Sequence, residues 1–456
     1  MWLDKTVESN KEEMYQTLQE LLRIPSVEEE PEEGAPHGRS VQDALEFMLQ
    51  KAEKMGFEVC DFDHQVGYCE YGEGNLIAVV AHLDVVPAGE GWSRDPFGGE
   101  ADEKFIYGRG AVDDKGPAVA ALYALYAIKQ LNLKLSRRIR IMFGTNEETG
   151  SHDMEHFFSH GGETPLMGFT PDGTYPLVNG EKGIIITALR RKYDQREGSA
   201  RLLKISGGTA FNVVPAAASA EIECGQDVYE KLLLRAGSEI KVTRNASSVR
   251  IDAYGESAHG STPEKGRNAI GILVSVLKDI PFAPSLNDAF SFLNDKIGME
   301  TDGKSLGICM SDEESGGLTL NLGTIKGGPD SMELGINYRY PVTKKLEDCA
   351  PVFNAAFAEH GFEVISQIHE PALYVDPESE LVVTLLDVYR EHTGDDSGAI
   401  CIGGGTYAKS VKNTVAFGPV FPGDPDREHK PDECIEKENL LMNAKIIAGA
   451  MYRLAQ

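Results

Sequence analysis

The stretch that decides the fold is AHLDVVP at residues 81–87, which follows the apolar run NLIAVV. That run is typical of a buried strand, so His82 and Asp84 come at its end or just beyond it. Side chains two residues apart on a strand share a face, and these two are therefore expected to project the same way. An imidazole beside a carboxylate is either an ordinary surface pair or a metal ligand oriented by its partner. The rest of the chain has to decide between these interpretations.

Length and composition indicate an ordinary globular protein with more than one domain. At 456 residues the chain is too long for a single compact core, so two domains are expected. The hydrophobic fraction is 41%, and we find no apolar run of about 18 residues that would span a membrane. The formal net charge of −28 argues against nucleic acid as a partner, because its phosphates would be repelled.

The first residues and the cysteines bear on where the protein works. The opening segment MWLDKTVESNKEEMYQ is acidic and polar, without the basic and apolar blocks of a signal peptide. The seven cysteines are scattered and form no CxxC pair, so reduced thiols are the simplest interpretation. We therefore expect a cytoplasmic protein with no membrane partner.

Strand and helix patterns alternate over the first third of the chain. Residues 75–86 are typical of a buried strand and residues 116–131 of a packed helix. This alternation predicts a mainly parallel central sheet with helices on both faces, and such sheets bind ligands at the carboxyl ends of their strands. His82, Glu147 and Asp172 all come where an apolar run ends.

The pattern changes near Gly183, where alternating and β-rich segments with interleaved helix candidates begin. The α/β pattern returns near residue 370 and continues to the end of the chain. We therefore predict an α/β fold with a discontinuous catalytic domain, formed by residues 1–182 and 370–456. An inserted α+β lid domain is expected at residues 183–369.

Five places carry side chains that suit metal chemistry. They are AHLDVVP with His82 and Asp84, GRGAVDDKG with Asp113, GTNEETG with Glu147 and Glu148, FTPDG with Asp172, and REHKPDE with His429. Each alone has an ordinary explanation, such as a solvated turn or a helix cap. Together, converging carboxylates repel one another and are costly to bury without a cation. Two imidazoles complete a set of ligands suited to Zn²⁺, and a carboxylate shared by two ions is typical of a two-metal hydrolase.

The motifs resemble those of the co-catalytic zinc metallopeptidases, the family that includes aminoacylases, carboxypeptidase G and the PepV-type dipeptidases. Five motifs are especially similar to the PepV type: HLDVVPAGEGWSRDPF, IYGRGAVDDKGP, GTNEETG, PDGTYPLVNGEKG and GGGTYAK. The match covers nearly the whole chain in order and is weakest at residues 191–205 and 280–317.

The resemblance implies two Zn²⁺ ions per chain, with Mn²⁺ or Co²⁺ as substitutes. His82 and Asp172 are expected to hold one ion. Glu148 and His429 are expected to hold the other, and Asp113 to bridge both. The peptide bond that follows Asp113 is expected to be cis, as is typical of the family.

The resemblance also implies roles in catalysis. Asp84 is expected to accept a hydrogen bond from His82 and orient it. Glu147 is expected to be the general base, taking a proton from the attacking water and passing it to the leaving amine. In the lid, GESAHGSTPEKGRNA resembles the family segment whose histidine, here His259, donates toward the developing oxyanion. A loop histidine that caps the following helix is the alternative for His259.

Two more segments supply candidates for substrate binding. Asn212 in TAFNVVP and Arg339 in INYRYP resemble lid residues that hold the substrate, and Arg339 has the fork that grips a carboxylate. In GGGTYAK, Gly404 and Gly405 are expected to offer backbone amides to a ligand carboxylate, and Thr406 a hydroxyl. Hydrogen bonding at strand ends and a plain turn are the alternatives for these residues.

The expected activity is that of a metallo-dipeptidase cleaving short unblocked peptides, with β-alanyl dipeptides among the candidate substrates. The alternative is a deacylase or carboxypeptidase acting on N-acylated amino acids, because the ligands and the amide chemistry are shared. A non-catalytic peptide-binding relative is a third hypothesis, which the presence of Glu147 and of all five ligands disfavours.

The length of the predicted insertion bears on the oligomeric state. Family members with a small lid commonly pair through it, so that a second subunit's histidine completes the site. The insertion predicted here is long for that arrangement and resembles the enlarged lid of the PepV type. A monomer is therefore expected, with a homodimer as the alternative.

Overall fold

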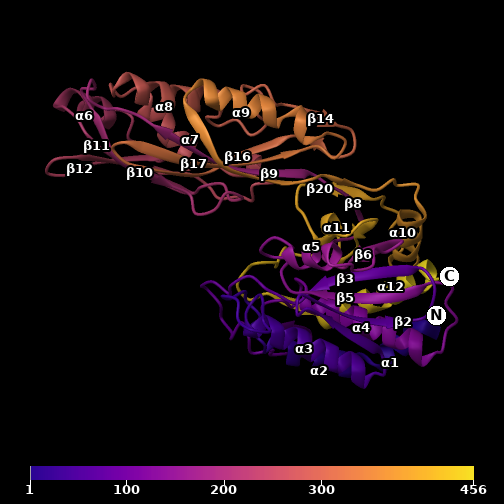
Figure 1. Cartoon of the computed structure of the whole chain (residues 1–456). Coiled ribbons are helices and arrows are strands. Elements are labelled where there is room, and N and C mark those ends of the chain that lie inside the picture. Colours follow the sequence, from indigo (N-terminus) through magenta and orange to yellow (C-terminus); the bar gives the residue numbers. More distant parts are fainter. Residues whose placement is uncertain (1) are drawn as a thin grey trace. The chain divides into compact units, whose positions relative to one another are not determined.

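The structure, a computed structural model, describes residues 2–456 and divides into two compact units (Figure 1). Unit 1 comprises the chain up to Asn179, Val375–Ile400 and Gly405–Gln456, and unit 2 comprises Gly180–Tyr374 and Cys401–Gly404. The sequence places the inserted lid at residues 183–369, and a lid function for unit 2 stays a prediction. None of the helices among residues 2–456 combines the length and apolar character needed to cross a membrane.

Unit 1 is built on a mixed sheet with a parallel core. Its strands, in sheet order, are β1 (Glu58–Phe62), β2 (Val66–Tyr71), β5 (Arg138–Gly144), β3 (Leu76–His82), β6 (Met167–Thr170), β21 (Thr414–Ala416) and β8 (Val178–Glu181). The short strands β19 (Leu373–Tyr374) and β20 (Ile400–Ile402) pair with β8 where the chain passes into unit 2. The neighbours β5, β3, β6 and β21 run parallel, and the strands outside them are antiparallel. Although it comes late in the chain, β21 lies inside the sheet.

Helices cover both faces of this sheet, as the continuous apolar run of β3 predicts. Ile77, Val79 and Ala81 belong to a core cluster that includes residues of α1 to α4, α10 and α12, whereas Ala78 and Val80 pack with residues of α5 and α11. The bounds are α1 (Trp2–Ser9), α2 (Lys11–Leu22), α3 (Arg39–Lys54), α4 (Lys115–Gln130), α5 (His152–Ser159), α10 (Glu380–Thr393), α11 (Tyr407–Ser410) and α12 (Lys437–Leu454). The predicted α/β class is thus confirmed, and the sheet, which was predicted to be mainly parallel, is mixed with a parallel core.

Two small strand pairs complete unit 1. In one, β4 (Phe105–Tyr107) pairs antiparallel with β23 (Cys434–Glu436), and in the other, β7 (Gly173–Thr174) pairs with β22 (Pro419–Val420). The first pair joins the segment before Asp113 to the segment after His429, which lie far apart in the sequence.

Unit 2 is an eight-stranded antiparallel sheet with helices packed on one face (Figure 1). Its strands, in sheet order, are β12 (Ile240–Arg244), β13 (Val249–Tyr254), β11 (Ala217–Glu223), β10 (Arg201–Gly207), β16 (Thr319–Gly327), β17 (Ser331–Tyr340), β9 (Gly183–Lys192) and β18 (Phe362–Glu370). The helices are α6 (Gln226–Leu233), α7 (Ala269–Leu277), α8 (Pro284–Lys296) and α9 (Ala350–Glu359), with a small hairpin of β14 (Ser311–Asp312) and β15 (Gly316–Gly317). In β13, Val249 and Ile251 face the helices, and Arg250 and Tyr254 face away from them. This is the expected inserted α+β architecture.

Candidate functional site

The candidate site lies at the carboxyl ends of the parallel strands of unit 1. His82 is the last residue of β3, Asp172 follows β6, and Glu147 follows β5. Because β5, β3 and β6 are parallel neighbours, their carboxyl ends meet at one edge of the sheet. The fold therefore brings together the three residues at which the apolar runs end.

Two groups of potential metal ligands meet at this edge. The first is His82, Asp113 and Asp172, and the second is Asp113, Glu148 and His429. Within each group the ligand atoms all lie within 4.8 Å of one another. All five ligands that the family resemblance implies are thus found in these two groups.

Asp113 belongs to both groups through its two carboxylate oxygens. Its Oδ1 lies 2.9 Å from Nε2 of His82, and its Oδ2 lies 2.9 Å from Nε2 of His429. Farther out, Nε2 of His82 is 3.7 Å from Oδ2 of Asp172, and Nε2 of His429 is 3.2 Å from Oε2 of Glu148. One carboxylate therefore faces two ligand sets, as a bridging ligand must.

The charges around the two imidazoles favour positive charge at this place. The pKa of His429 is raised to about 11 by its hydrogen bonds to Asp113 and Glu148. Burial alone would lower the pKa of His82, but its contacts with Asp113 and Asp84 outweigh burial and raise that pKa well above the ordinary value. Burial likewise opposes ionisation of Asp113, yet the two imidazoles hold its pKa below the usual range.

This donor set fits a pair of divalent metal ions. Imidazole nitrogens and carboxylate oxygens are ligands of Zn²⁺, and each group offers one imidazole and two carboxylates. The crowded carboxylates need positive charge nearby, because unpaired buried anions are costly. Two cations that share Asp113 would supply this charge.

Asp84 was predicted only to orient His82 by accepting its hydrogen bond, and the structure gives it a second role. Nδ1 of His82 hydrogen-bonds to the main-chain oxygen of Asp84 at 2.9 Å, whereas the Asp84 carboxylate is 3.4 Å away. That carboxylate accepts the main-chain N–H groups of Glu147 at 3.2 Å and of Glu148 at 3.0 Å. Asp84 therefore orients His82 mainly through its backbone and holds the Glu147–Glu148 turn through its side chain.

Glu147 stands beside the ligands, and neither ligand group found among residues 2–456 includes it. Burial raises the pKa of its carboxyl well above the ordinary value, and the negative charge of Asp172 adds to the shift. A carboxyl with a raised pKa holds a captured proton more readily than an exposed one. Glu147 is therefore suited to accept and return a proton.

Two acidic residues that the sequence analysis did not single out support the Asp113 loop. Asp114, joined to Asp113 by a cis peptide bond as expected, accepts the main-chain N–H of His82 at 3.0 Å. Glu433 is only 1% exposed and accepts N–H groups of the loop that carries Asp113. Both stand in the motifs GRGAVDDKG and REHKPDE, but no sequence pattern indicates hydrogen bonds between loops so far apart.

In unit 2, the structure brings Asn212 and His259 together. Val213 forms an isolated β-bridge with His259, and the N–H of Gly260 donates to the carbonyl of Asn212 at 2.6 Å. The N–H of Ser261 donates to Nδ1 of His259 at 3.4 Å. Nδ1 of His259 also lies 2.6 Å from the hydroxyl oxygen of Ser261, a contact that either ring tautomer allows.

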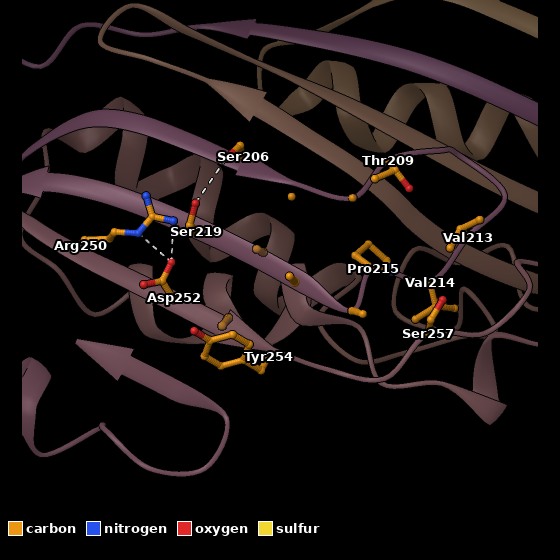
Figure 2. A pocket seen from close by; sticks show the side chains of 16 residues that line it. Ser206, Thr209, Val213, Val214, Pro215, Ser219, Arg250, Asp252, Tyr254 and Ser257 are labelled. Atoms are coloured by element: carbon orange, nitrogen blue, oxygen red, sulfur yellow. Dashed lines mark hydrogen bonds and ion pairs between the residues drawn. The ribbon is translucent and has the colours of Figure 1, made fainter. Parts of the chain in front are cut away.

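A pocket of about 440 Å³ lies on the side of the unit 2 sheet that its helices leave open (Figure 2). Its wall carries the ion pair between Arg250 and Asp252, at 2.7 Å, and the hydroxyl of Ser219. Val213 and Ser257 also line it, and they are close in sequence to Asn212 and His259. Neither of the ligand groups found in the described chain involves this pocket, so the metal chemistry is assigned to unit 1.

Arg339 lies in β17 and is 4% exposed. Its guanidinium donates to Oδ1 of Asn337 at 3.1 Å and to the carbonyl of Gly403. Burial lowers its pKa to about 10, which leaves it charged at neutral pH. Arg339 is thus a fixed cation that adjoins the glycine-rich segment of unit 2.

The remaining residues of GGGTYAK have different surroundings. The hydroxyl oxygen of Thr406 accepts the N–H of Ala408 at 3.1 Å and so caps α11. Gly404 has no positive φ, and a Cβ added there would meet only Ile402, at an ordinary 3.5 Å. Neither strain nor a close protein neighbour therefore requires glycine at Gly404. Gly405, in unit 1, is exposed.

Comparisons with known proteins give a consistent result over nearly the whole sequence. The sequence profile described as "Peptidase family M20/M25/M40" matches residues 78–453. The protein named "Putative dipeptidase YtjP", from Bacillus subtilis strain 168, is 40% identical over 463 residues, which is 98% of this chain and 98% of that protein. A Staphylococcus epidermidis protein named "Putative dipeptidase" is 32% identical over 469 residues, covering 100% of this chain and 99% of its own length.

The fold also has solved counterparts. The crystal structure of human carnosine dipeptidase 1 aligns over 100% of this chain and 98% of its own, with a TM-score of 0.57. The sequences are 16% identical, so this likeness concerns the fold alone.

Proposed function

The chain belongs to the peptidase family M20/M25/M40, as its motifs indicated, and we propose that it is a metal-dependent dipeptidase that hydrolyses short unblocked peptides. The observation that carries this proposal is the Asp113 carboxylate, shared by two ligand groups with Glu147 beside them. The dipeptidase names of the relatives at 40% and 32% identity support free peptides as the substrate.

The proposed cofactor is a pair of Zn²⁺ ions, with Mn²⁺ or Co²⁺ as substitutes. His82 and Asp172 would hold one ion, Glu148 and His429 the other, and Asp113 both. When bound, such ions polarise the substrate carbonyl and lower the pKa of water.

Glu147 is proposed to carry the proton through the reaction. Its carboxylate takes a proton from the attacking water as the new C–O bond forms, and gives it to the amine nitrogen as the C–N bond breaks. The pKa of Glu147, raised by burial and by the charge of Asp172, suits a group that holds the proton between these steps. The hydrogen bonds from the Glu147 and Glu148 main chain to Asp84 fix the turn from which it acts.

His259 is proposed to donate a ring N–H to the oxygen that develops negative charge, as the likeness of GESAHGSTPEKGRNA to the family segment supports. Replacing His259 by alanine is expected to lower kcat by about 10²–10³-fold, because one oxyanion donor is lost. Bound metal, measured by elemental analysis, should stay unchanged. His152→Ala, at an exposed histidine of unit 1, is the control, and an unaltered kcat in His259→Ala would remove the residue from the reaction.

The same variant tests the proposed monomer. If His259 acted across a homodimer, mixing His259→Ala with Glu147→Ala protein would restore part of the activity after subunit exchange. Mixtures of the two variants are expected to stay inactive, and light scattering of the wild type should give the mass of one chain.

The substrate contacts are proposed from residue chemistry. The buried cation Arg339 is assigned to the C-terminal carboxylate, and Asn212 to a hydrogen bond with the substrate. Gly404 and Gly405 are assigned to amide contacts with the ligand. The hydroxyl of Thr406, whose oxygen also caps α11, is assigned to a hydrogen bond with the ligand.

A panel of substrates tests the activity and separates it from deacylation by the same site. Metal-replete protein is expected to cleave free dipeptides, with β-alanyl dipeptides included in the panel, and a chelator should abolish the cleavage. N-acetyl and N-succinyl amino acids should be cut at least about tenfold more slowly, a difference of about 1.4 kcal/mol in transition-state binding. Faster cleavage of acylated substrates would identify a deacylase, and no cleavage at all would favour a peptide-binding relative.

A further inference from the structure

The ligand loops of unit 1 are tied together by a buried carboxylate, that of Glu433. Its Oε1 accepts the main-chain N–H of Gly110 at 3.1 Å, of Val112 at 2.9 Å and of Asp113 at 3.3 Å. Its Oε2 accepts a hydrogen bond from Arg109 at 2.5 Å. One side chain from the last part of the chain therefore holds the whole turn that ends in Asp113.

Arg109 extends this connection to a third loop. Its guanidinium is 2% exposed, donates to the carbonyl of Ala88 at 3.3 Å and lies 5.4 Å from the ring of Trp92. A second link joins the same loops, because the N–H of Ser93 donates to Asp432 at 2.8 Å. The Arg109–Glu433 pair is thus the centre of a network that reaches the loops after His82, before Asp113 and after His429.

A buried ion pair is weak evidence for stability, since its desolvation cost offsets much of its Coulomb energy. The side chains of Arg109 and Glu433 are only 2% and 0% exposed. Stability alone therefore does not explain why this ion pair is buried beside the ligand loops. Its partners are the backbone of a ligand loop rather than the ligand side chains, which is the position of an outer-shell support.

We propose that Glu433, paired with Arg109, is a positioning residue that sets the metal position formed by Asp113, Glu148 and His429. This inference rests on the proposed function, because it assumes that the two ligand groups bind metal. The Glu433 carboxylate holds the main chain of Asp113 by a hydrogen bond. Its pairing with Arg109 also anchors the segment that follows His429.

The two metal positions depend on this support to different degrees. His82 is fully buried at the end of β3, and Asp172 directly follows β6, so the sheet itself holds two ligands of the first position. His429 is on a loop, has a side chain 53% exposed and a positive φ of 59°, and has no strand to fix it. Loss of the Glu433 contacts should therefore weaken the second position more than the first.

The test is a Co²⁺ titration of Glu433→Gln in the otherwise intact protein, followed by the visible absorption of the bound ion and by elemental analysis. Glutamine has nearly the same shape as glutamate. Its amide NH₂ group is a donor, however, and cannot accept the hydrogen bond from Arg109. The second equivalent of Co²⁺ is expected to bind about 10–100-fold more weakly, the usual cost of losing an outer-shell partner, while the first equivalent changes little. The spectrum of the second equivalent should also change.

The matched control is Glu70→Gln, the same exchange in another Arg–Glu pair of unit 1. Glu70 lies 2.5 Å from Arg140, and their side chains are 19% and 5% exposed. This control should keep the wild-type affinity for both equivalents even where it lowers the melting temperature. A merely structural role for Glu433 would instead make the two variants behave alike.

Glu433→Asp provides a second variant if the glutamine variant does not fold. It keeps the charge beside Arg109 and withdraws the oxygen from the N–H groups of the Asp113 loop, so the same selective loss is expected. Equal affinities in a folded variant and the wild type, or equal weakening of both equivalents, would overturn the inference. Failure of the wild type to bind two equivalents would instead count against the proposed metal pair.

Discussion

Replacing Glu147 by glutamine is expected to lower kcat by at least about 10²–10⁴-fold while the protein keeps both metal ions. The exchange preserves size and removes the group that accepts the proton of the attacking water. Neither ligand group of the described residues includes Glu147, so metal binding has no reason to change. Steady-state kinetics on a free dipeptide, with elemental analysis of the same sample, measures both quantities.

Glu148→Gln is the matched control, because the same exchange is made one residue along the same turn. Glu148 belongs to the group with Asp113 and His429, so this variant should lose metal from one position as well as activity. The contrast between the neighbours separates proton transfer from metal binding. Wild-type kcat in a metal-replete Glu147→Gln protein would rule out the general base proposed here.

Replacing Asp113 by asparagine is expected to weaken both metal positions at once and to reduce activity by about 10³-fold or more. The first effect follows because the two oxygens of Asp113 face His82 and His429 separately, at 2.9 Å each. The second follows because metal polarisation contributes several kcal/mol to the transition state, and about 1.4 kcal/mol is a factor of ten. Isothermal titration of the metal-free variant with Zn²⁺ gives the two affinities.

His429→Ala is the comparison that makes this result specific, since His429 belongs to one ligand group only. It should retain one equivalent of metal, whereas Asp113→Asn should retain neither tightly. Asp95→Asn repeats the acid-to-amide exchange at an exposed position and should bind both ions normally. Retention of two tight equivalents by Asp113→Asn would mean that this carboxylate does not bridge.

The parts of the site that local sequence patterns alone predicted are those at strand ends. The apolar runs before His82, Glu147 and Asp172 can be recognised in the sequence itself. Parallel pairing of the strands then brings their ends together. His429 has no such run before it, and its proposed role came from the resemblance of REHKPDE to a family motif. Its place near Asp113 depends on the pairing of β4 with β23, a contact between distant segments that no local pattern encodes.

The parts that the sequence did not predict are hydrogen bonds to the main chain. Asp84 faces His82 mostly with its carbonyl oxygen and uses its carboxylate for the N–H groups of Glu147 and Glu148. Glu433 likewise binds backbone N–H groups of the Asp113 loop. A carboxylate in a sequence does not indicate which amides it will meet, because every residue except proline offers the same N–H.

The late position of β21 in the chain has a consequence for biosynthesis. As the polypeptide leaves the ribosome, β6 and β8 emerge long before β21, the strand that lies between them. All eight strands of the unit 2 sheet are complete by Glu370, so that unit is able to fold while unit 1 still lacks an interior strand and His429. Domains usually fold in the order in which they are translated. Here the unit that begins first is the one that finishes last.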